Sequence, residues 1–339
     1  MITGLTWVWA EFILCAALIG IAGPVLVRNG DIIGRLTGVS QSWIGLVLLA
    51  TATSLPELFT GLSSVTMAAQ PNIAVGDALG SCVFNLLLLV LLDELCRGEP
   101  LYRRIDQGQI LTAAFGIILI GSTGAVILLS KDTLNISFLH MSVYTPFIIV
   151  LYFVAMRAAF VYESRQALGA MSVRTTGGIS LKVAAIRYAV AAAVVVVAGS
   201  WLPFIGSDLS EIMGWRTTFV GTIFIAGATS LPELVVSVSA VRMGAVDMAI
   251  STLLGSNLFN VLILALDDMA YTEGSLFAAV SSAHVVSVIA AVVMSGIFIV
   301  AVLYRPKTRL HGTIGWVSLS LLLVYLLSAY AAYETGHSE

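Results

Sequence analysis

Runs of about twenty mostly apolar residues follow one another along almost the whole chain. An α-helix needs about 20 such residues to cross the hydrocarbon core of a membrane. Only 10% of the 339 residues are charged, whereas soluble domains carry about 25% charged residues. The pattern predicts an integral, all-α membrane protein with ten spans, at residues 7–27, 40–67, 72–95, 108–129, 141–162, 181–203, 214–241, 246–268, 276–302 and 312–333.

The basic residues provide a test of this prediction, because cytoplasmic loops are enriched in Lys and Arg. Ten spans divide the segments between them into two sets, one for each side of the membrane. One set holds only Lys131 and Arg216, and the other holds the rest of the 16 basic residues. We therefore expect the basic loops to be cytoplasmic and both termini to lie outside, in a plasma membrane of the prokaryotic type.

Two blocks of sequence recur in the two halves of the chain. The first copy reads ATSLPELFTGLSSV (52–65) and NIAVGDALGSCVFN (72–85), and the second reads ATSLPELVVSVSAV (228–241) and DMAISTLLGSNLFN (247–260). Since each half has five predicted spans, the second half must enter the membrane from the opposite side, an arrangement typical of secondary transporters. The sequence predicts two inverted five-helix repeats, at 1–163 and 181–339, joined by a cytoplasmic linker at 164–180.

One glutamate lies near the middle of a predicted span in each copy, at Glu57 and Glu233. A carboxylate at the centre of a bilayer costs about 2.5–3.5 kcal/mol on insertion scales. Pro56 and Pro232 precede the two glutamates, and a proline inside a helix breaks it and frees a backbone carbonyl. A protonated glutamate bonded to a neighbouring helix, or a simple proline kink, does not explain two matched acids at two matched breaks. The pattern favours a functional site at two broken helices in mid-membrane.

Hydroxyl and amide side chains accompany the glutamates at a spacing of four residues, which places two side chains on one face of a helix. An all-oxygen set suits hard cations such as Ca²⁺ or Na⁺ and argues against zinc or copper. Some of the hydroxyls are expected to bond backbone carbonyls four residues earlier instead. The pairs are Thr53 with Glu57, Ser81 with Asn85, Thr229 with Glu233, and Ser256 with Asn260.

A third acid, Asp77, breaks the symmetry of the two copies, because its counterpart is Thr252. We expect Asp77 to lie off the face that carries Ser81 and Asn85, and so outside the set of ligands. Two ionised glutamates then give the site a charge of −2, which one Ca²⁺, two Na⁺ or two protons would balance. The sequence leaves the stoichiometry open.

These blocks resemble the two alpha repeats of the cation/calcium exchanger superfamily, the family of sodium/calcium exchangers. The resemblance rests on ATSLPEL and GSCVFN in the first half and on ATSLPEL and GSNLFN in the second, and it extends to the ten-span inverted layout. It implies an antiporter of Ca²⁺ that works by alternating access, is not an enzyme and needs no cofactor. The positions that match the family's ion ligands are Glu57, Glu233, Thr53, Thr229, Ser54, Ser81, Ser230, Ser256, Asn85 and Asn260, with the backbone carbonyls of Ala50 and Ala226.

Two departures from the family pattern bear on the counter-ion. Asn260 stands where prokaryotic and potassium-dependent relatives often carry Asp, which argues against potassium dependence. Ser251-Thr252 replaces a frequent Gly-Asn, and potassium-dependent relatives also carry Ser there. The proton-coupled branch has a different pattern around its glutamates, so the resemblance implies Na⁺ as the counter-ion, with H⁺ or another transported cation as alternatives.

Two other classes of protein fit the sequence less well. A cation channel would pass Ca²⁺ without a counter-ion, and an inverted repeat has no purpose in an intramembrane hydrolase. The basic residues form no stripe suited to nucleic acid. We therefore expect the partners to be Ca²⁺, Na⁺ and membrane lipid, and the sequence indicates no protein partner.

Overall fold

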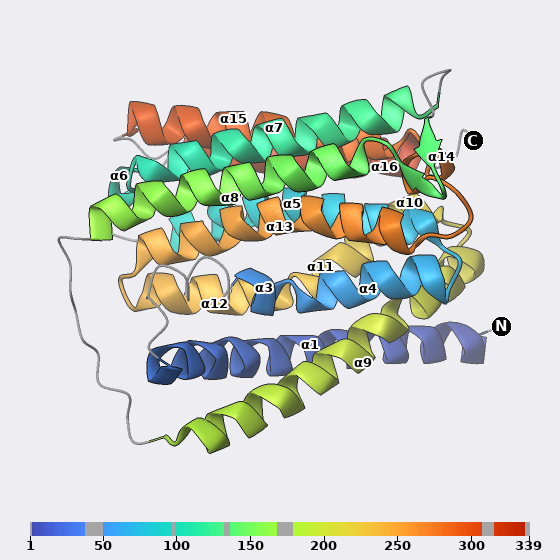
Figure 1. Cartoon of the computed structure of the whole chain (residues 1–339), viewed down its shortest axis with the longest axis horizontal. Helices are drawn as coiled ribbons and strands as arrows, with labels where there is room; N and C mark the ends of the chain where they lie inside the picture. The colour runs from blue at the N-terminus through green and yellow to red at the C-terminus, as the bar shows by residue number, and fades with distance from the viewer. Residues whose placement is uncertain are drawn as a thin grey trace.

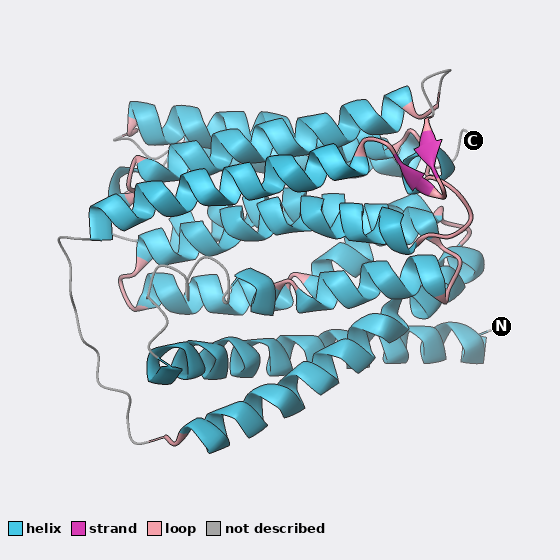
Figure 2. Ribbon diagram, in the orientation of Figure 1, coloured by secondary structure: helices cyan, strands magenta, loops and turns pink. Residues whose placement is uncertain are grey.

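The computed structural model describes residues 2–37, 50–96, 99–131, 136–167, 179–306 and 315–335. Within these ranges the chain is helical, apart from loops and one short antiparallel hairpin of β1 (Ser137–Phe138) and β2 (Met141–Ser142), as Figure 2 shows. Seven helices in these ranges are long and apolar enough to cross a membrane, as expected of an integral membrane protein. They are α1 (Ile2–Thr37), α5 (Pro71–Leu95), α7 (Gly108–Leu129), α9 (Leu181–Met213), α13 (Val246–Ala270), α15 (His284–Tyr304) and α16 (Trp316–Thr335).

Both Ser-Leu-Pro-Glu motifs interrupt their helices. In the first copy α3 (Ala50–Thr53) ends before Ser54 and α4 (Leu55–Thr66) follows it. In the second copy α10 (Thr217–Val220), the π-helix η2 (Gly221–Ile225) and α11 (Ala226–Thr229) precede Ser230, and α12 (Leu231–Arg242) follows it. The backbone turns alike at the two serines, with φ/ψ of −92°/14° at Ser54 and −79°/8° at Ser230.

The proline accounts for the position of each break. Each proline lies in the first turn of the following helix, where its missing N–H costs no hydrogen bond. In the second copy the helices before and after the break meet at an angle of 45° and together are apolar enough to form an eighth, broken span. The helix breaks predicted from Pro56 and Pro232 are thus present.

Several predicted boundaries are wrong. The span predicted to end at 203 continues to Met213, because Pro203 is accommodated inside α9 and Gly214 ends the helix in the left-handed conformation. The span predicted to begin at 276 begins at His284, because residues 276–279 form the separate short helix α14 (Leu276–Ala279).

The other differences concern α8 (Thr145–Ala167) and the residues that the structure leaves out. The apolar stretch of α8, Thr145–Ala159, is shorter than a full span. Residues 40–49 of the second predicted span and 168–178 of the predicted linker lie outside the described residues. The ten-span layout and the orientation of the termini therefore stay predictions.

The helices pack in layers around α5 and α13 (Figure 1). These two helices contact each other in the middle of the bundle, with α7, α8 and α15 on one side and the broken helices on the other. On the far side of the broken helices α1 and α9 pack against each other, and they lie at the edge of the bundle in Figure 1. The two motifs therefore lie between the central pair α5/α13 and the outer pair α1/α9.

The outer helices approach the two breaks through glycines. A Cβ atom on Gly23 of α1 would stand 2.5 Å from Cβ of Pro232, and one on Gly199 of α9 would stand 3.0 Å from the carbonyl oxygen of Pro56. Real Cβ atoms essentially never come within 3.0 Å of such neighbours. Each outer helix thus packs directly on the break of the opposite half. A side chain at Gly23 would push the two apart, and one at Gly199 would require a shift of a few tenths of an ångström.

Two aspartates at the ends of the central helices fasten the halves together. Asp93 accepts hydrogen bonds from Leu101 N (2.9 Å) at the start of α6 (Leu101–Arg104) and from Ser318 Oγ (2.8 Å) of α16. Its counterpart Asp268 accepts from Leu276 N (2.8 Å) at the start of α14 and from the Thr145 hydroxyl of α8. In both halves the acid therefore joins the following short helix to a long helix of the other half.

Candidate cation site

The two glutamates lie in the first turns of α4 and α12, and both are buried, with Glu57 1% and Glu233 0% exposed. Ser230 Oγ donates to Oε1 of Glu57 at 3.5 Å, and Ser54 Oγ donates to Oε1 of Glu233 at 3.3 Å. Each glutamate is therefore bonded by the serine of the other copy of the motif. This exchange brings the two halves into one network.

The hydroxyls predicted as ligands line the same network. Ser256 Oγ donates to Oε1 of Glu233 at 3.1 Å and lies 3.2 Å from Thr53 Oγ1. Ser230 Oγ, besides its bond to Glu57, lies 3.1 Å from Ser81 Oγ. Thr53, which precedes the helix break at Ser54, thus contacts α13 of the other half. The spacing of four between Thr53 and Glu57 did not indicate this contact.

The Thr229 hydroxyl has one proton and lies near both a backbone carbonyl, the kind of acceptor predicted for some of the hydroxyls, and a side-chain acceptor. Its Oγ1 lies 3.1 Å from the carbonyl oxygen of Ile225, four residues earlier. The same oxygen also lies 3.5 Å from Ser81 Oγ and donates to Oδ1 of Asp77 at 2.8 Å. Thr229 therefore connects α5 to the broken helix.

Asp77 belongs to this network, and the expectation that it lies off the face of Ser81 is wrong. The two residues are four apart on α5 and hence on one helix face. Asp77 is fully buried, and its Oδ1 accepts the hydrogen bond from Thr229. The sequence already contained this spacing, which is the signal that should have included Asp77.

Several buried oxygens in the network have no hydrogen-bond partner among the described residues. They are Oε2 of Glu57, Oε2 of Glu233, Oδ2 of Asp77, Oδ1 of Asn85 and Oδ1 of Asn260. A buried polar atom without a partner costs about 1–3 kcal/mol, and more if it is charged. Buried oxygens without a protein donor are available to coordinate a cation.

The two asparagines differ in their surroundings. Asn85 Nδ2 donates to Oδ1 of Asn257 at 3.0 Å, and Asn257 Nδ2 donates to the carbonyl oxygen of Cys82 at 3.2 Å. Asn260 has no hydrogen-bond partner for its amide among the described residues. Asn257 was not predicted; it occupies the same position in its copy of the motif as Cys82, and the pair lies where α5 and α13 cross.

The two alanines predicted to offer carbonyls lie just before the breaks. The carbonyl oxygen of Ala226 accepts from Ser230 N at 3.1 Å and therefore already has a partner. Ala50 is the first residue of α3, directly after residues that the structure leaves out. Hydrogen bonds and short contacts join eight of the other ten predicted residues around the two breaks, in one set with Glu57 and one with Glu233, whereas Asn85 and Asn260 make no such contact with either set within the described residues.

The donors in this region are oxygens of two glutamates, amides and hydroxyls. No group of three or more His, Cys, Asp or Glu side chains is arranged to hold a metal ion in the part of the chain that the structure describes. Carboxylate, carbonyl and hydroxyl oxygens are ligands for hard cations. The chemistry of the donors therefore fits Ca²⁺ or Na⁺ better than a transition metal.

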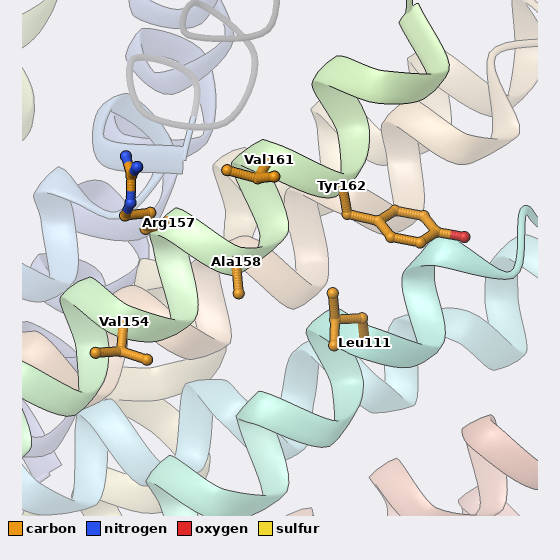
Figure 3. A pocket seen from close by; sticks show the side chains of 6 residues that line it. All are labelled: Leu111, Val154, Arg157, Ala158, Val161 and Tyr162. Atoms are coloured by element: carbon orange, nitrogen blue, oxygen red, sulfur yellow. The ribbon is translucent and has the colours of Figure 1, made fainter.

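A separate groove runs along the outer side of α7 and α8 (Figure 3). It is lined by Leu111, Val154, Arg157, Ala158, Val161 and Tyr162. Arg157 and Tyr162 are exposed, and none of the predicted site residues lines the groove. The groove is therefore separate from the network around the two glutamates.

The fold and this network define a polytopic helical membrane protein with acids buried at two helix breaks. The sequence profile described as sodium/calcium exchanger protein matches residues 7–162 and 183–333. The chain therefore belongs to the sodium/calcium exchanger family, a family of cation antiporters.

Two prokaryotic relatives match over most of their own length. The inner membrane protein YrbG of Escherichia coli is 29% identical over 244 residues, which cover 70% of this chain and 72% of YrbG. The sodium/calcium exchanger MaX1 of Methanosarcina acetivorans is 26% identical over 289 residues, which cover 74% of this chain and 81% of MaX1.

Solved structures share the fold. The sodium-calcium exchanger NCX_Mj superposes with a TM-score of 0.61 at 20% identity, over 96% of this chain and 98% of that one. YfkE superposes with a TM-score of 0.67 at 16% identity, over 97% of this chain and 92% of that one. This chain thus shares its overall arrangement of helices with two solved proteins that differ widely from it in sequence.

Proposed function

We propose that the chain is a secondary antiporter that exchanges Ca²⁺ for Na⁺ by alternating access. Glu57 and Glu233 are the principal ligands, and the hydroxyls of Thr53, Ser54 and Ser81 assist them together with those of Thr229, Ser230 and Ser256. Asn85 and Asn260 close the site, with the carbonyls of Ala50 and Ala226 beside it. Membership of the exchanger family and the sodium/calcium exchanger MaX1 among its relatives support this proposal.

The observation that carries the proposal is the exchange of hydrogen bonds between the two breaks. Ser54 bonds Glu233 and Ser230 bonds Glu57, while one oxygen of each carboxylate is left without a partner among the described residues. A site built from both halves at once changes whenever one half moves relative to the other. Such a site can open to either side in turn.

The burial of both glutamates supports exchange rather than one-way passage. Two bare carboxylates in a dry interior are costly, so the closed site crosses the membrane cheaply only when cations neutralise it. One Ca²⁺ neutralises two carboxylates, and so do two Na⁺. The carrier therefore returns loaded with the counter-ion, which couples the two fluxes.

The proposed layout has ten spans in two inverted repeats, at 1–163 and 181–339. The linker 164–180 is cytoplasmic and both termini lie outside, as the distribution of basic residues predicts. The matched breaks at Ser54 and Ser230 and the matched acids Asp93 and Asp268 are consistent with this layout. Cysteine accessibility at Glu273 and Glu99, each replaced in turn by Cys in sealed cells, tests the sidedness, because the layout puts these two loop positions on opposite faces.

The experiment for the exchange is ⁴⁵Ca²⁺ uptake into proteoliposomes that contain the purified full chain. We expect uptake driven by an outward Na⁺ gradient and its loss in Glu57→Gln and in Glu233→Gln, since each change removes one of the two charges. Glu211→Gln is the matched control, because Glu211 is exposed on α9. Each protein is first shown to run as a single species in detergent.

Three results would redirect the assignment. Uptake driven by a pH gradient and indifferent to Na⁺ would make H⁺ the counter-ion. Uptake without any counter-ion, with unitary currents in planar bilayers, would make the protein a channel. Full activity of both glutamine variants would rule out the two-glutamate site itself.

A further inference from the structure

The outer face of α8 is apolar along its length except for one arginine. Phe147, Val150, Val154, Arg157 and Val161 follow one another at spacings of three and four residues, so they lie on one face of the helix. Phe147, Val150 and Val154 are exposed. In a membrane protein, exposed apolar side chains of this kind lie against the acyl chains of lipids. This face of α8 is therefore covered by the membrane.

The groove between α7 and α8 belongs to the same surface. Its aliphatic lining consists of Leu111, Val154, Ala158 and Val161. Leu111 of α7 lies two turns before the exposed Ile118, so the α7 wall of the groove faces outward as well. The groove has a volume of about 470 Å³, within the range of roughly 300–1,000 Å³ of ligand pockets. It opens toward lipid and offers a ligand an aliphatic wall.

Arg157 places a positive charge beside this wall. The apolar stretch of α8, Thr145–Ala159, is about 22 Å long, whereas the hydrocarbon core of a membrane is about 30 Å thick. Arg157 lies in this stretch, where a charged side chain is costly unless it reaches the headgroups. Its side chain points away from Leu111 and Val154, so the guanidinium lies at the rim of the groove (Figure 3). It makes no ion pair with an acid among the described residues.

Tyr162 marks the level of the headgroups at the same end of the groove. It lies five residues, or about 7.5 Å, beyond Arg157 toward the end of α8. Gly108, the first residue of α7, makes room for the ring, because a Cβ atom there would stand 2.9 Å from Cδ1 of Tyr162. Tyrosines are enriched where the hydrocarbon meets the headgroups. In the proposed layout this end of α8 is cytoplasmic, and the cytoplasmic leaflet carries anionic lipids.

We propose that this groove is a binding site for an anionic phospholipid of the cytoplasmic leaflet. The guanidinium of Arg157 donates hydrogen bonds to the phosphate, for which its planar fork is suited. One acyl chain lies along Leu111, Val154 and Ala158, and Tyr162 borders the headgroup. The lipid site goes beyond the proposed ion exchange, because none of its lining residues belongs to the network around the two glutamates.

The charge and the shape together select this occupant. A zwitterionic lipid would bring a cation of its own next to Arg157, and a soluble phosphate would leave the aliphatic wall without a partner. A second copy of the chain that packed on this face by two-fold symmetry would meet the same patch, whose lining residues include no acid to pair with Arg157. An anionic phospholipid satisfies both the arginine and the wall.

The test is native mass spectrometry of the purified full chain in detergent that contains equal amounts of phosphatidylglycerol and phosphatidylcholine with the same acyl chains. We expect phosphatidylglycerol to be retained in preference to phosphatidylcholine. Arg157→Gln should lower the ratio of the two retained lipids by roughly fivefold, the contribution of one basic residue at an anionic membrane surface. Arg187→Gln is the matched control and should keep the wild-type ratio, because Arg187 is exposed on α9 and does not line the groove.

A second variant tests the wall rather than the charge. Ala158→Trp fills the groove and should reduce the retention of phosphatidylglycerol although Arg157 is intact. If Ala158→Trp does not run as a single species in detergent, Val154→Trp fills the groove from an exposed position. An excess of soluble glycerol phosphate should not displace the lipid.

Four results would overturn the proposal. An unchanged ratio in Arg157→Gln, or equal falls in Arg157→Gln and Arg187→Gln, would show that the groove does not select the headgroup. Wild-type retention in the variant with the filled groove would place the lipid elsewhere. Displacement by glycerol phosphate would reduce the site to one for phosphate alone. A wild-type dimer that dissociates when the groove is filled, without any preference for phosphatidylglycerol, would assign this face to a second copy of the chain.

Discussion

The two ends of the bundle, one at the turn between α4 and α5 and the other at the turn between α12 and α13, share a framework but differ in charge. Both halves have a glutamate after a broken turn, a glycine of an outer helix against the opposite proline, and an aspartate that anchors a short helix. Only the α4–α5 end adds Asp77 and Asp267, where the other end has Thr252 and Leu92.

This difference separates acids that stabilise the fold through hydrogen bonds from acids that do not. The matched aspartates Asp93 and Asp268 have their carboxylate oxygens bonded by protein groups. The unmatched acids, above all Asp267, do not. The matched aspartates therefore belong to the architecture of both halves, whereas Asp267 lies in one half only and has no donor among the described residues.

The largest expected effect concerns the central pair. Glu57→Gln and Glu233→Gln should each reduce Ca²⁺ uptake by at least about 100-fold, and by similar factors, because each removes one of two charges that bind the same ion. Initial rates of ⁴⁵Ca²⁺ uptake measure this. A loss of uptake in only one of the two variants would show that the two glutamates do not contribute equally to binding the ion.

The anchors of the short helices come next. Asp93→Ala and Asp268→Ala should each destabilise the protein by about 2–4 kcal/mol, since each leaves at least one buried backbone N–H, Leu101 N or Leu276 N, without its acceptor. Thermal unfolding in detergent, followed by tryptophan fluorescence, measures the change. Wild-type stability in both variants would show that the matched aspartates are not structural.

Replacing the two glycines that pack on the prolines should destabilise the protein to different extents. Gly23→Ala should cost about 1–3 kcal/mol by overpacking against Pro232, and Gly199→Ala should cost less, because its nearest contact of 3.0 Å leaves more room than 2.5 Å. Thermal unfolding again gives the order. Gly121→Ala is the control, because a Cβ atom at Gly121 meets nothing within 4 Å.

The smallest effect concerns the exchanged serines. Ser54→Ala and Ser230→Ala each remove one hydroxyl bond to the glutamate of the other half, worth about 0.5–1.5 kcal/mol. We expect the apparent Ca²⁺ affinity in uptake assays to fall by roughly two- to tenfold in each variant. A double variant with Glu233→Gln should lose nothing further from Ser54→Ala, because the two residues act on the same charge.

Much of the site could be predicted from local sequence. The repeated ATSLPEL block and the proline in it located both helix breaks. The spacing of oxygen-bearing residues selected eight side chains, and the resemblance to the exchanger family added Ser54 and Ser230. Asn257 was missed, because an amide inside GSNLFN carries no signal until α5 and α13 are seen to cross. Asp77 was excluded, although its spacing of four from Ser81 placed it on the same face.

The sequence by itself indicated the membrane environment from the length of its apolar runs, and the repeat from the identity between segments. It indicated a cation as the ligand from the chemistry of the side chains. All three are local properties of the sequence. The tertiary structure alone decided that Ser54 serves Glu233 and that Ser230 serves Glu57, since the two breaks meet only when the halves pack face to face. It also decided that Asp268 is satisfied and Asp267 is not. Two adjacent aspartates are equivalent in sequence, and only the helices around them give one its donors and leave the other without any.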